Sequence, residues 1–255
     1  MPEFSAAGTA LSSNGLSEAS QAAGVGLPEI WSVLSVETSG CGFLPDRRPK
    51  ILFERHVFHR LTGGRFDGDD PDVSQPTAGG YGPSGAHQYE RLAAAIQLNR
   101  NAALQSASWG MGQIMGENFG TAGFTVIEDM VAAMVESEDK QLIAMAKFII
   151  ANRMGEALRN HDWQGFARRY NGPNYAANNY DGHLASYYQR YADGNLPDLR
   201  VRAAQIYLTY RGFAPGAIDG IMGSATAAAT RRFQHSTGAP ETGIVDDALI
   251  AKLSA

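Results

Sequence analysis

The chain of 255 residues is poor in cysteine, in net charge and in long apolar runs. Its single cysteine, Cys41, excludes an intramolecular disulfide framework and any metal site that needs several thiolates. A formal net charge of -5 provides no basic surface for a nucleic acid. No run approaches the roughly 18 apolar residues of a membrane span, and the first residues lack the basic start and apolar core of a secretory signal. We therefore expect a protein that is kept in a cytoplasm, binds no nucleic acid and does not insert into a membrane.

What is present is an ordinary globular composition, with 44% hydrophobic and 18% charged residues. The length suffices for one large domain, or for one medium and one small domain. Apolar residues recur at helical spacing through most of the chain, whereas the short apolar run at residues 50–53 is typical of a strand. The sequence therefore predicts a mainly α-helical protein with a short strand-containing segment.

The sequence divides into a leader and two domains. The first residues are rich in Ala, Ser and Gly and predict a flexible leader. After Pro197 a new pattern begins, in which residues 218–226 and 241–249 share a turn-then-helix layout. A repeated unit of this kind argues for a separate small domain. The predicted boundaries are 1–16 for the leader, 17–195 for the large domain and 196–255 for the small, three-helix domain.

A helix predicted from Pro28 toward Gly40 carries a carboxyl group on its apolar face. Pro28 suits the first turn of a helix, and Gly40 lies where a helix commonly ends. Glu37 follows Val33 by four residues and Leu34 by three, so it lies on the apolar side. Burial raises the pKa of a carboxyl group, which suits a general acid that works near neutral pH. The alternative is that Glu37 simply ends an amphipathic helix and turns toward water.

Two further segments have an unusual composition. Residues 62–85 are rich in Gly, Asp, Pro and Ser and predict a long loop, which is either functional or a solvated insertion. Around Trp109, the nearby Gly110 and Gly112 indicate a backbone that must approach another group closely.

Residues from 199 onward resemble the peptidoglycan-binding domain type 1, a small three-helix module attached to cell-wall enzymes. The matching residues are Val201, Ala204, Gln205, Leu208, Gly212, Phe213, Ile218, Asp219, Gly220, Gly223, Thr226, Phe233, Gln234, Gly243 and Val245. Most of these residue types serve turns and helix packing, so we assign them to the scaffold rather than to ligand contacts. Tyr207 and Tyr210 are candidates either for contact with glycan or stem peptide or for packing in the core.

The larger part, about residues 17–195, resembles the N-acetylmuramidase domain of phage endolysins, a relative of the goose-type lysozyme and lytic transglycosylase superfamily. The matching segments are residues 36–40, 42–46, 48–56, 107–116 and 170–175. They follow the order of the superfamily, with a glutamate motif, a Gly-x-x-Gln-Ile motif and a Tyr-Asn-x-Gly motif. Thr38 stands where the superfamily usually has serine, at a position that mainly supports the turn.

The resemblance implies a lysozyme-like helical catalytic domain with Glu37 as the acid that protonates the leaving oxygen of a glycosidic bond. Glu54 is our candidate for a second catalytic carboxylate, with an ion pair to Arg55 or another cation as the alternative. Further candidates for positioning water are Asp46 and the acidic residues 67–72. The expected substrate-binding residues are Gln113, Tyr170, Asn171 and Tyr175, together with Trp109, which either stacks on a sugar ring or packs in the core.

The predicted function is cleavage of the β-1,4 bond between N-acetylmuramic acid and N-acetylglucosamine in bacterial peptidoglycan. An endolysin of this kind would lyse its host after another phage protein opens the inner membrane. The alternatives are a lytic transglycosylase, which gives 1,6-anhydro products, and a non-catalytic wall-binding virion protein. An amidase or peptidase would need a zinc site or a Cys/His pair, but the spacing of Glu54, His56 and His59 does not match the zinc-peptidase motif. We therefore expect no metal and no other cofactor. We also expect a monomer.

Overall fold

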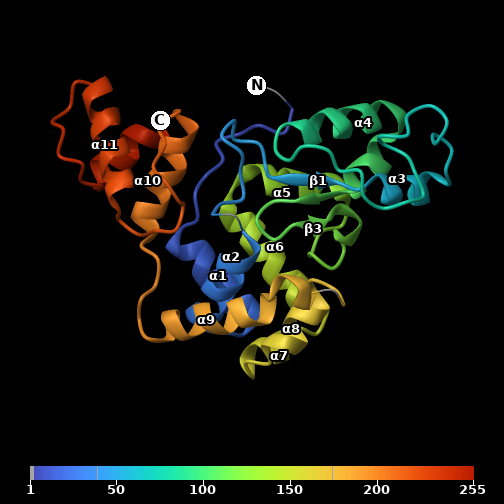
Figure 1. Cartoon of the computed structure of the whole chain (residues 1–255), viewed down its shortest axis with the longest axis horizontal. Coiled ribbons are helices and arrows are strands. Elements are labelled where there is room, and N and C mark those ends of the chain that lie inside the picture. Colours follow the sequence, from blue (N-terminus) through green and yellow to red (C-terminus); the bar gives the residue numbers. More distant parts are fainter. Residues whose placement is uncertain (1–2, 39, 174) are drawn as a thin grey trace.

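The computed structural model describes residues 3–38, 40–173 and 175–255 (Figure 1). Ser39 and Asn174, which belong to the matching segments 36–40 and 170–175, lie outside the described residues. The described parts of the chain form twelve α-helices, two short 3-10 helices and one three-stranded sheet. The prediction of a mainly helical protein with a short strand-containing segment is confirmed. In these parts of the chain, no helix is both long and apolar enough to cross a membrane.

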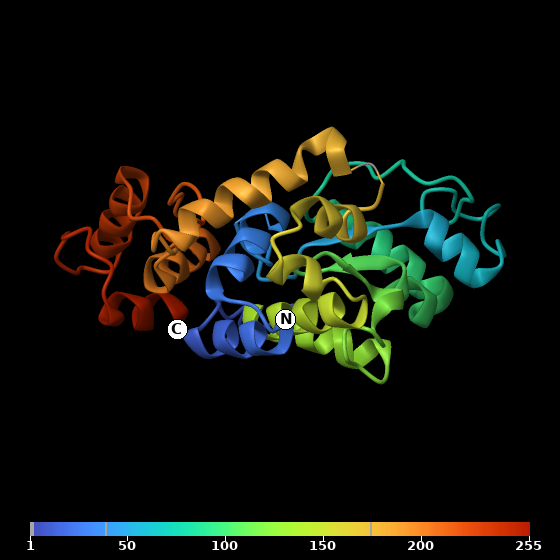
Figure 2. The same ribbon diagram turned by 90° about the horizontal axis from the view of Figure 1, so that it is seen from below.

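One half of the large domain is entirely helical. Its elements are α1 (Ser13–Ala23), α2 (Leu27–Glu37), α6 (Glu138–Ala151), α7 (Gly155–Arg159), α8 (Trp163–Tyr170) and α9 (Tyr180–Ala192), with the 3-10 helix η2 (Tyr175–Asn178). Helix α1 packs on α6, and α2 packs on α9. Helix α9 runs along the molecule toward the small domain (Figure 2). Helix α2, which ends at Glu37, is thereby fixed by its packing on α9.

The other half is built around the small sheet. Its elements are β1 (Ile51–Phe53), β2 (Ala107–Trp109), β3 (Ile114–Met115), α3 (Arg55–Thr62), α4 (His87–Gln105), α5 (Ile127–Glu136) and the 3-10 helix η1 (Gly116–Asn118). The strands are antiparallel in the order β1-β2-β3, with Leu52 opposite Ser108 and Trp109 opposite Ile114. Phe53 and Trp109 are fully buried. The sheet therefore fixes the glycine-rich turn between β2 and β3 on an apolar support.

Side-chain caps start helices in both domains. Ser12, Ser137 and Asp162 accept backbone N–H groups at the starts of α1, α6 and α8. Asp198 and Asp246 do the same at the starts of α10 (Leu199–Tyr210) and α12 (Asp247–Ser254) in the small domain. Such caps satisfy N–H groups that have no partner within the helix, so they define where each helix begins.

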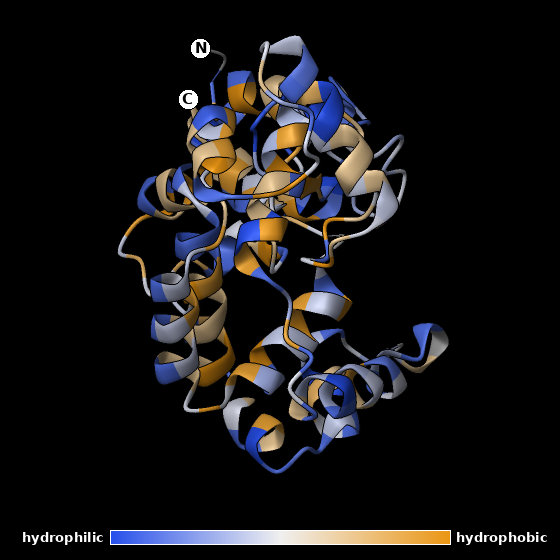
Figure 3. Ribbon diagram, turned by 90° about the vertical axis from the view of Figure 1, so that its left-hand side faces the viewer, coloured by the Kyte–Doolittle hydropathy of each residue, from blue (hydrophilic) through white to orange (hydrophobic). Residues whose placement is uncertain are grey.

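Helices α10, α11 (Ser224–Ser236) and α12 form the small domain around their own apolar cluster, which includes Leu208, Phe233 and Leu253. Figure 3 shows hydrophobic and hydrophilic residues on the same helices. Two buried residues from outside the small domain, Ala10 and Cys41, belong to the same cluster. The two domains therefore share packing across their boundary.

Residues 3–16, where we expected a flexible leader, pack against both domains. The ring of Phe4 contacts the rings of Tyr89 and Trp109, and Leu11 is buried. The backbone N–H of Ala10 donates to the Tyr207 hydroxyl at 3.2 Å. Helix α1 already begins at Ser13. Three apolar residues in this segment pack in or against the apolar clusters of the protein: Phe4, Ala10 and Leu11. The small polar residues around them gave no sequence signal of this packing.

Candidate active site

Glu37 is the last residue of α2, and its position follows from how that helix ends. Thr38 adopts an extended conformation, and both its backbone N–H and its hydroxyl donate to the Leu34 carbonyl, at 3.0 and 2.7 Å. The helix therefore stops before Gly40. Ile30, Val33 and Leu34 are buried, and Glu37 itself is half-buried. The structure thus places the carboxyl group at the edge of the apolar face rather than in open water.

Burial raises the pKa of Glu37 from 4.5 to about 7, and the hydrogen bond from Asn171 partly opposes this rise. The Asn171 side-chain amide donates to Oε1 of Glu37 at 3.0 Å. Asn171 follows directly after α8, so the end of that helix holds the carboxyl group in place. A carboxyl group with such a pKa is largely protonated below neutral pH and can donate its proton.

The carboxyl group of Glu37 faces a cavity of about 400 Å³. The lining residues are Glu37, Thr38, Cys41 and Leu44 around the end of α2, Lys50, Ile51 and Leu52 from β1 and its approach, Ser84 and Gly85 before α4, and Gly110, Met111 and Gln113 between β2 and β3. Among these lining residues Glu37 is the one carboxylate. Because Ser84 and Gly85 belong to the long loop predicted over residues 62–85, the end of that loop contributes to the site.

Gln113 is held in the wall of this cavity by an uncommon backbone conformation. Its φ is 45°, in the left-handed region that few non-glycine residues adopt. Its side-chain amide donates to the Gly110 carbonyl at 2.8 Å, and Ser108 donates to its Oε1 at 2.9 Å. Backbone strain of this kind is typical of functional sites. The side chain remains exposed toward the cavity.

Tyr170 lies near Glu37 and contacts the turn between β2 and β3. Its hydroxyl donates to the Gly112 carbonyl at 2.9 Å. Burial and the nearby Glu37 charge raise the pKa of Tyr170 well above its usual value, so the hydroxyl stays protonated. Tyr170 and Asn171 are thus both joined to the site. Tyr175, the first residue of η2, is half-buried and is not part of the cavity wall.

Trp109 does not have the role expected of a substrate-binding residue. Its side chain is 0% exposed, and its indole N–H donates to the Leu104 carbonyl at 3.0 Å. A ring without exposed surface cannot stack on a sugar. The structure therefore corrects the assignment of Trp109 to substrate binding and gives it the alternative role of a core tryptophan beneath the glycine-rich turn.

Glu54 lies at the end of β1 and is the residue before α3. It does not line the Glu37 cavity. Its Oε2 is 3.1 Å from Nδ1 of His56, whereas the Arg55 guanidinium donates to the Thr77 carbonyl. The side chain that lies next to the Glu54 carboxylate is therefore that of His56 rather than that of Arg55. The role of Glu54 as a second catalytic carboxylate stays a prediction.

The histidines of this region have local carboxylate partners. Nδ1 of His59 lies 2.8 Å from Asp67 in the long loop. Within residues 3–38, 40–173 and 175–255, no three His, Cys, Asp or Glu side chains are grouped as metal ligands would be.

In the small domain, the hydroxyls of Tyr207 and Tyr210 bind the backbone of Ala10 and Gly8. These two tyrosines therefore join the domains.

Sequence reasoning missed two features of the site. Lys50, Ile51 and Leu52 line the cavity, and their only signal was their place in the matching segment 48–56. The contribution of Ser84 and Gly85 had no local signal beyond the length of the loop, because only the fold brings them beside Glu37.

Comparisons with known proteins agree with this geometry. A family model for N-acetylmuramidase matches residues 26–192, and a model for a peptidoglycan binding domain matches residues 198–253. The crystal structure of a Burkholderia AP3 phage endolysin is similar to the chain, with 39% sequence identity and a TM-score of 0.68. The similarity covers 72% of this chain and 71% of that one. The search of curated proteins found no match. The chain therefore belongs to the N-acetylmuramidase family and is a peptidoglycan-degrading endolysin with a C-terminal peptidoglycan-binding domain.

Proposed function

We propose that the chain cleaves the β-1,4 bond between N-acetylmuramic acid and N-acetylglucosamine, with Glu37 as the general acid. One observation carries this proposal: the half-buried carboxyl group of Glu37 faces a cavity, and burial raises the pKa of this group to about 7. A general acid is most effective when its pKa lies near the working pH. Among the described residues that line the cavity, no other side chain is a carboxyl group.

In the proposed reaction, protonated Glu37 gives its proton to the glycosidic oxygen while the bond from that oxygen to the sugar carbon breaks. The leaving chain departs as an alcohol, and positive charge develops on the muramic acid ring as an oxocarbenium-like centre. Water then attacks this carbon and gives a proton to the Glu37 carboxylate, which restores the acid and yields a reducing sugar. Asn171 positions Glu37 through its 3.0 Å hydrogen bond. Gln113 in the cavity wall, together with Tyr170 and Tyr175 outside the wall, is proposed to orient the sugar chain.

A second outcome is supported by one observation. Because Glu37 is the one carboxyl group among the cavity-lining residues, a mechanism that needs a single carboxylate also fits. In that mechanism the 6-hydroxyl of the muramic acid attacks the same carbon and returns its proton to Glu37. The product is a 1,6-anhydro sugar, and the enzyme is then a lytic transglycosylase. Glu54 would be dispensable for this reaction.

Digestion of purified peptidoglycan tests both outcomes. We compare wild type, Glu37→Gln, Glu54→Gln and the surface control Glu90→Gln, whose side chain is 75% exposed, and separate the products by mass spectrometry. The proposal predicts reducing muropeptides from wild type and Glu90→Gln and none from Glu37→Gln. Anhydro products would assign the transglycosylase reaction instead. Full activity of Glu37→Gln would remove Glu37 from the mechanism.

We further propose that the activity lyses a phage-infected bacterium from within. This role requires another protein to open the inner membrane, because the chain must reach the wall. Expression in a bacterium with and without a membrane-permeabilising protein tests it. The proposal predicts rapid loss of turbidity when both proteins are present, and none when Glu37→Gln replaces the wild type.

A further inference from the structure

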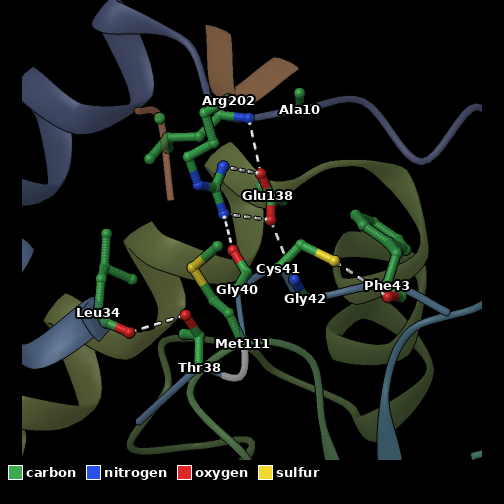
Figure 4. A network of polar contacts seen from close by, with 12 residues as sticks. Ala10, Leu34, Thr38, Gly40, Cys41, Gly42, Phe43, Met111, Glu138 and Arg202 are labelled. Atoms are coloured by element: carbon green, nitrogen blue, oxygen red, sulfur yellow. Dashed lines mark hydrogen bonds and ion pairs between the residues drawn. The ribbon is translucent and has the colours of Figure 1, made fainter. Parts of the chain in front are cut away.

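The turn that follows Glu37 is held by an arginine from the peptidoglycan-binding domain. Arg202 of α10 is only 4% exposed in its side chain, and its Nη2 donates to the Gly40 carbonyl at 2.8 Å (Figure 4). The same guanidinium donates to both carboxylate oxygens of Glu138, the first residue of α6. A planar guanidinium can satisfy a carboxylate and a carbonyl at once, whereas a lysine ammonium cannot reproduce this geometry.

Glu138 fixes the other end of the same turn. Its side chain is 0% exposed, and its oxygens also accept the backbone N–H groups of Gly42 and Leu11, both at 2.9 Å. One buried Arg–Glu pair therefore holds Gly40 through its carbonyl and Gly42 through its N–H (Figure 4). The turn between these residues has little freedom to shift while the pair is intact.

Packing reinforces this polar network. Gly40 has a φ of 90°, and a Cβ placed there would lie 3.0 Å from the Ile218 Cβ of the small domain. The buried Cys41 side chain packs into the apolar cluster of that domain. Thr38 and Cys41 also line the cavity of Glu37. The small domain thus shapes one wall of the active site through residues that directly follow the catalytic candidate.

We propose that Arg202 is a positioning residue of the active site, which holds the turn after Glu37 so that the large domain is fully active only with the small domain docked. The inference rests on the function proposed for Glu37. It goes beyond the role of a wall-binding domain as a tether that raises local concentration. Because a misplacement of about 1 Å can lower a rate by about 100-fold, fixing this turn is sufficient to control turnover.

Kinetics on small substrates separate positioning from tethering. The full-length variants are Arg202→Lys, the double variant Arg202→Met/Glu138→Leu, and the matched control Arg200→Lys on the same helix, where the Arg200 side chain is 54% exposed. We measure kcat and KM on soluble glycan fragments, and co-sedimentation with insoluble peptidoglycan. The double variant replaces the buried pair by apolar groups, so it is expected to fold even if a single change does not.

The proposal predicts that kcat falls about tenfold or more in Arg202→Lys and in the double variant. KM and co-sedimentation should match those of Arg200→Lys. Wild-type kcat in the double variant, or in a folded Arg202→Lys, would overturn the proposal. If Glu37→Gln turns over the fragments as fast as wild type, the function proposed for Glu37 fails instead, so the two failures are distinguishable.

Alkylation of Cys41 gives a second, independent readout, because this single thiol is buried in the shared cluster. We expect slow alkylation by iodoacetamide in wild type and Arg200→Lys. In Arg202→Lys the turn should open more often, so the rate should rise together with the loss of kcat. Equal alkylation rates in all folded variants would contradict a positioning role for Arg202.

Discussion

Glu37 has the position and environment that acid catalysis requires, and the same environment opposes its ionisation. Its pKa is raised because burial disfavours the charged form more than the Asn171 hydrogen bond favours it. In the unfolded chain the group ionises at its ordinary pKa of 4.5. The folded protein therefore binds more protons than the unfolded protein between pH 4.5 and about 7, and its stability falls as the pH rises through this range.

Replacement of Glu37 by glutamine should therefore stabilise the protein at alkaline pH. Glutamine has a similar shape, can still accept from Asn171 and carries no charge. At pH 8 we expect the free energy of unfolding of Glu37→Gln to exceed that of wild type by about 1–3 kcal/mol. The difference should vanish below pH 4.5, where wild type is protonated in both states. Denaturant unfolding of both proteins at pH 8 and below pH 4.5 measures the two free energies. If Glu37→Gln and wild type differ by the same amount at both pH values, the pKa of Glu37 is not raised.

The hydrogen bond from Asn171 should lower the pKa of Glu37. Because its hydrogen bond favours the carboxylate, Asn171→Ala removes an influence that lowers the pKa of Glu37. We expect the fall of kcat on the alkaline side to move to higher pH and the maximal kcat to drop about tenfold or more, since the carboxyl group loses its orientation. A pH series on soluble glycan fragments measures both. If the alkaline fall of kcat does not move, Asn171 does not influence the pKa of Glu37.

At the scale of elements, local patterns predicted most helices but not the whole sheet. Apolar residues at helical spacing predicted a mainly helical protein, and the helices of the described residues confirm it. The strand around residues 50–53 was predicted, but β2 and β3 have only three and two residues, too short for a periodic signal. Trp109 lies in β2, and only the pairing of β2 with β1 reveals that its ring points into the core.

Trp109→Phe tests this correction. The change removes the indole N–H that satisfies the buried Leu104 carbonyl and leaves a small void. We expect a loss of about 1–3 kcal/mol in the free energy of unfolding, with KM for glycan fragments unchanged. Thermal or denaturant unfolding and steady-state kinetics measure the two effects. A raised KM without loss of stability would restore the sugar-stacking role.

At the scale of the whole molecule, the two domains form a continuous structure rather than units joined only by a linker. Glu138 and Arg202 are 64 residues apart, and neither belongs to a motif that signalled a contact. Each alone is a charged residue, and such residues are usually solvated. Their burial depends on how the small domain docks, which the sequence of either domain does not determine. The same holds for the packing of Ala10 and Cys41 in the small domain's cluster.

Breaking the Glu138–Arg202 pair should strongly destabilise the protein. Burial raises the pKa of Glu138, but the Arg202 charge and the hydrogen bonds lower it below its usual value. The pair therefore stabilises the fold at neutral pH and loses this effect as the pH falls through the folded-state pKa. Arg202→Met should cost about 3–5 kcal/mol at pH 7, because Glu138 then remains buried and unpaired. Denaturant unfolding should show part of this loss recovered in Arg202→Met/Glu138→Leu, because the buried charge is gone while the Gly42 and Leu11 N–H groups still lose their acceptor. Equal losses in both variants would contradict the account.

The central claim is that Glu37 acts as a protonated acid, and the pH dependence of kcat on soluble glycan fragments tests it most directly. With a pKa of about 7, kcat should be limited by loss of the Glu37 proton and should fall about tenfold per pH unit above pH 7 to 8. Glu37→Gln should be inactive across the whole range, while Glu90→Gln follows wild type. A wild-type kcat that stays constant to pH 9, or a measurable kcat in Glu37→Gln with the wild-type profile, would contradict the claim.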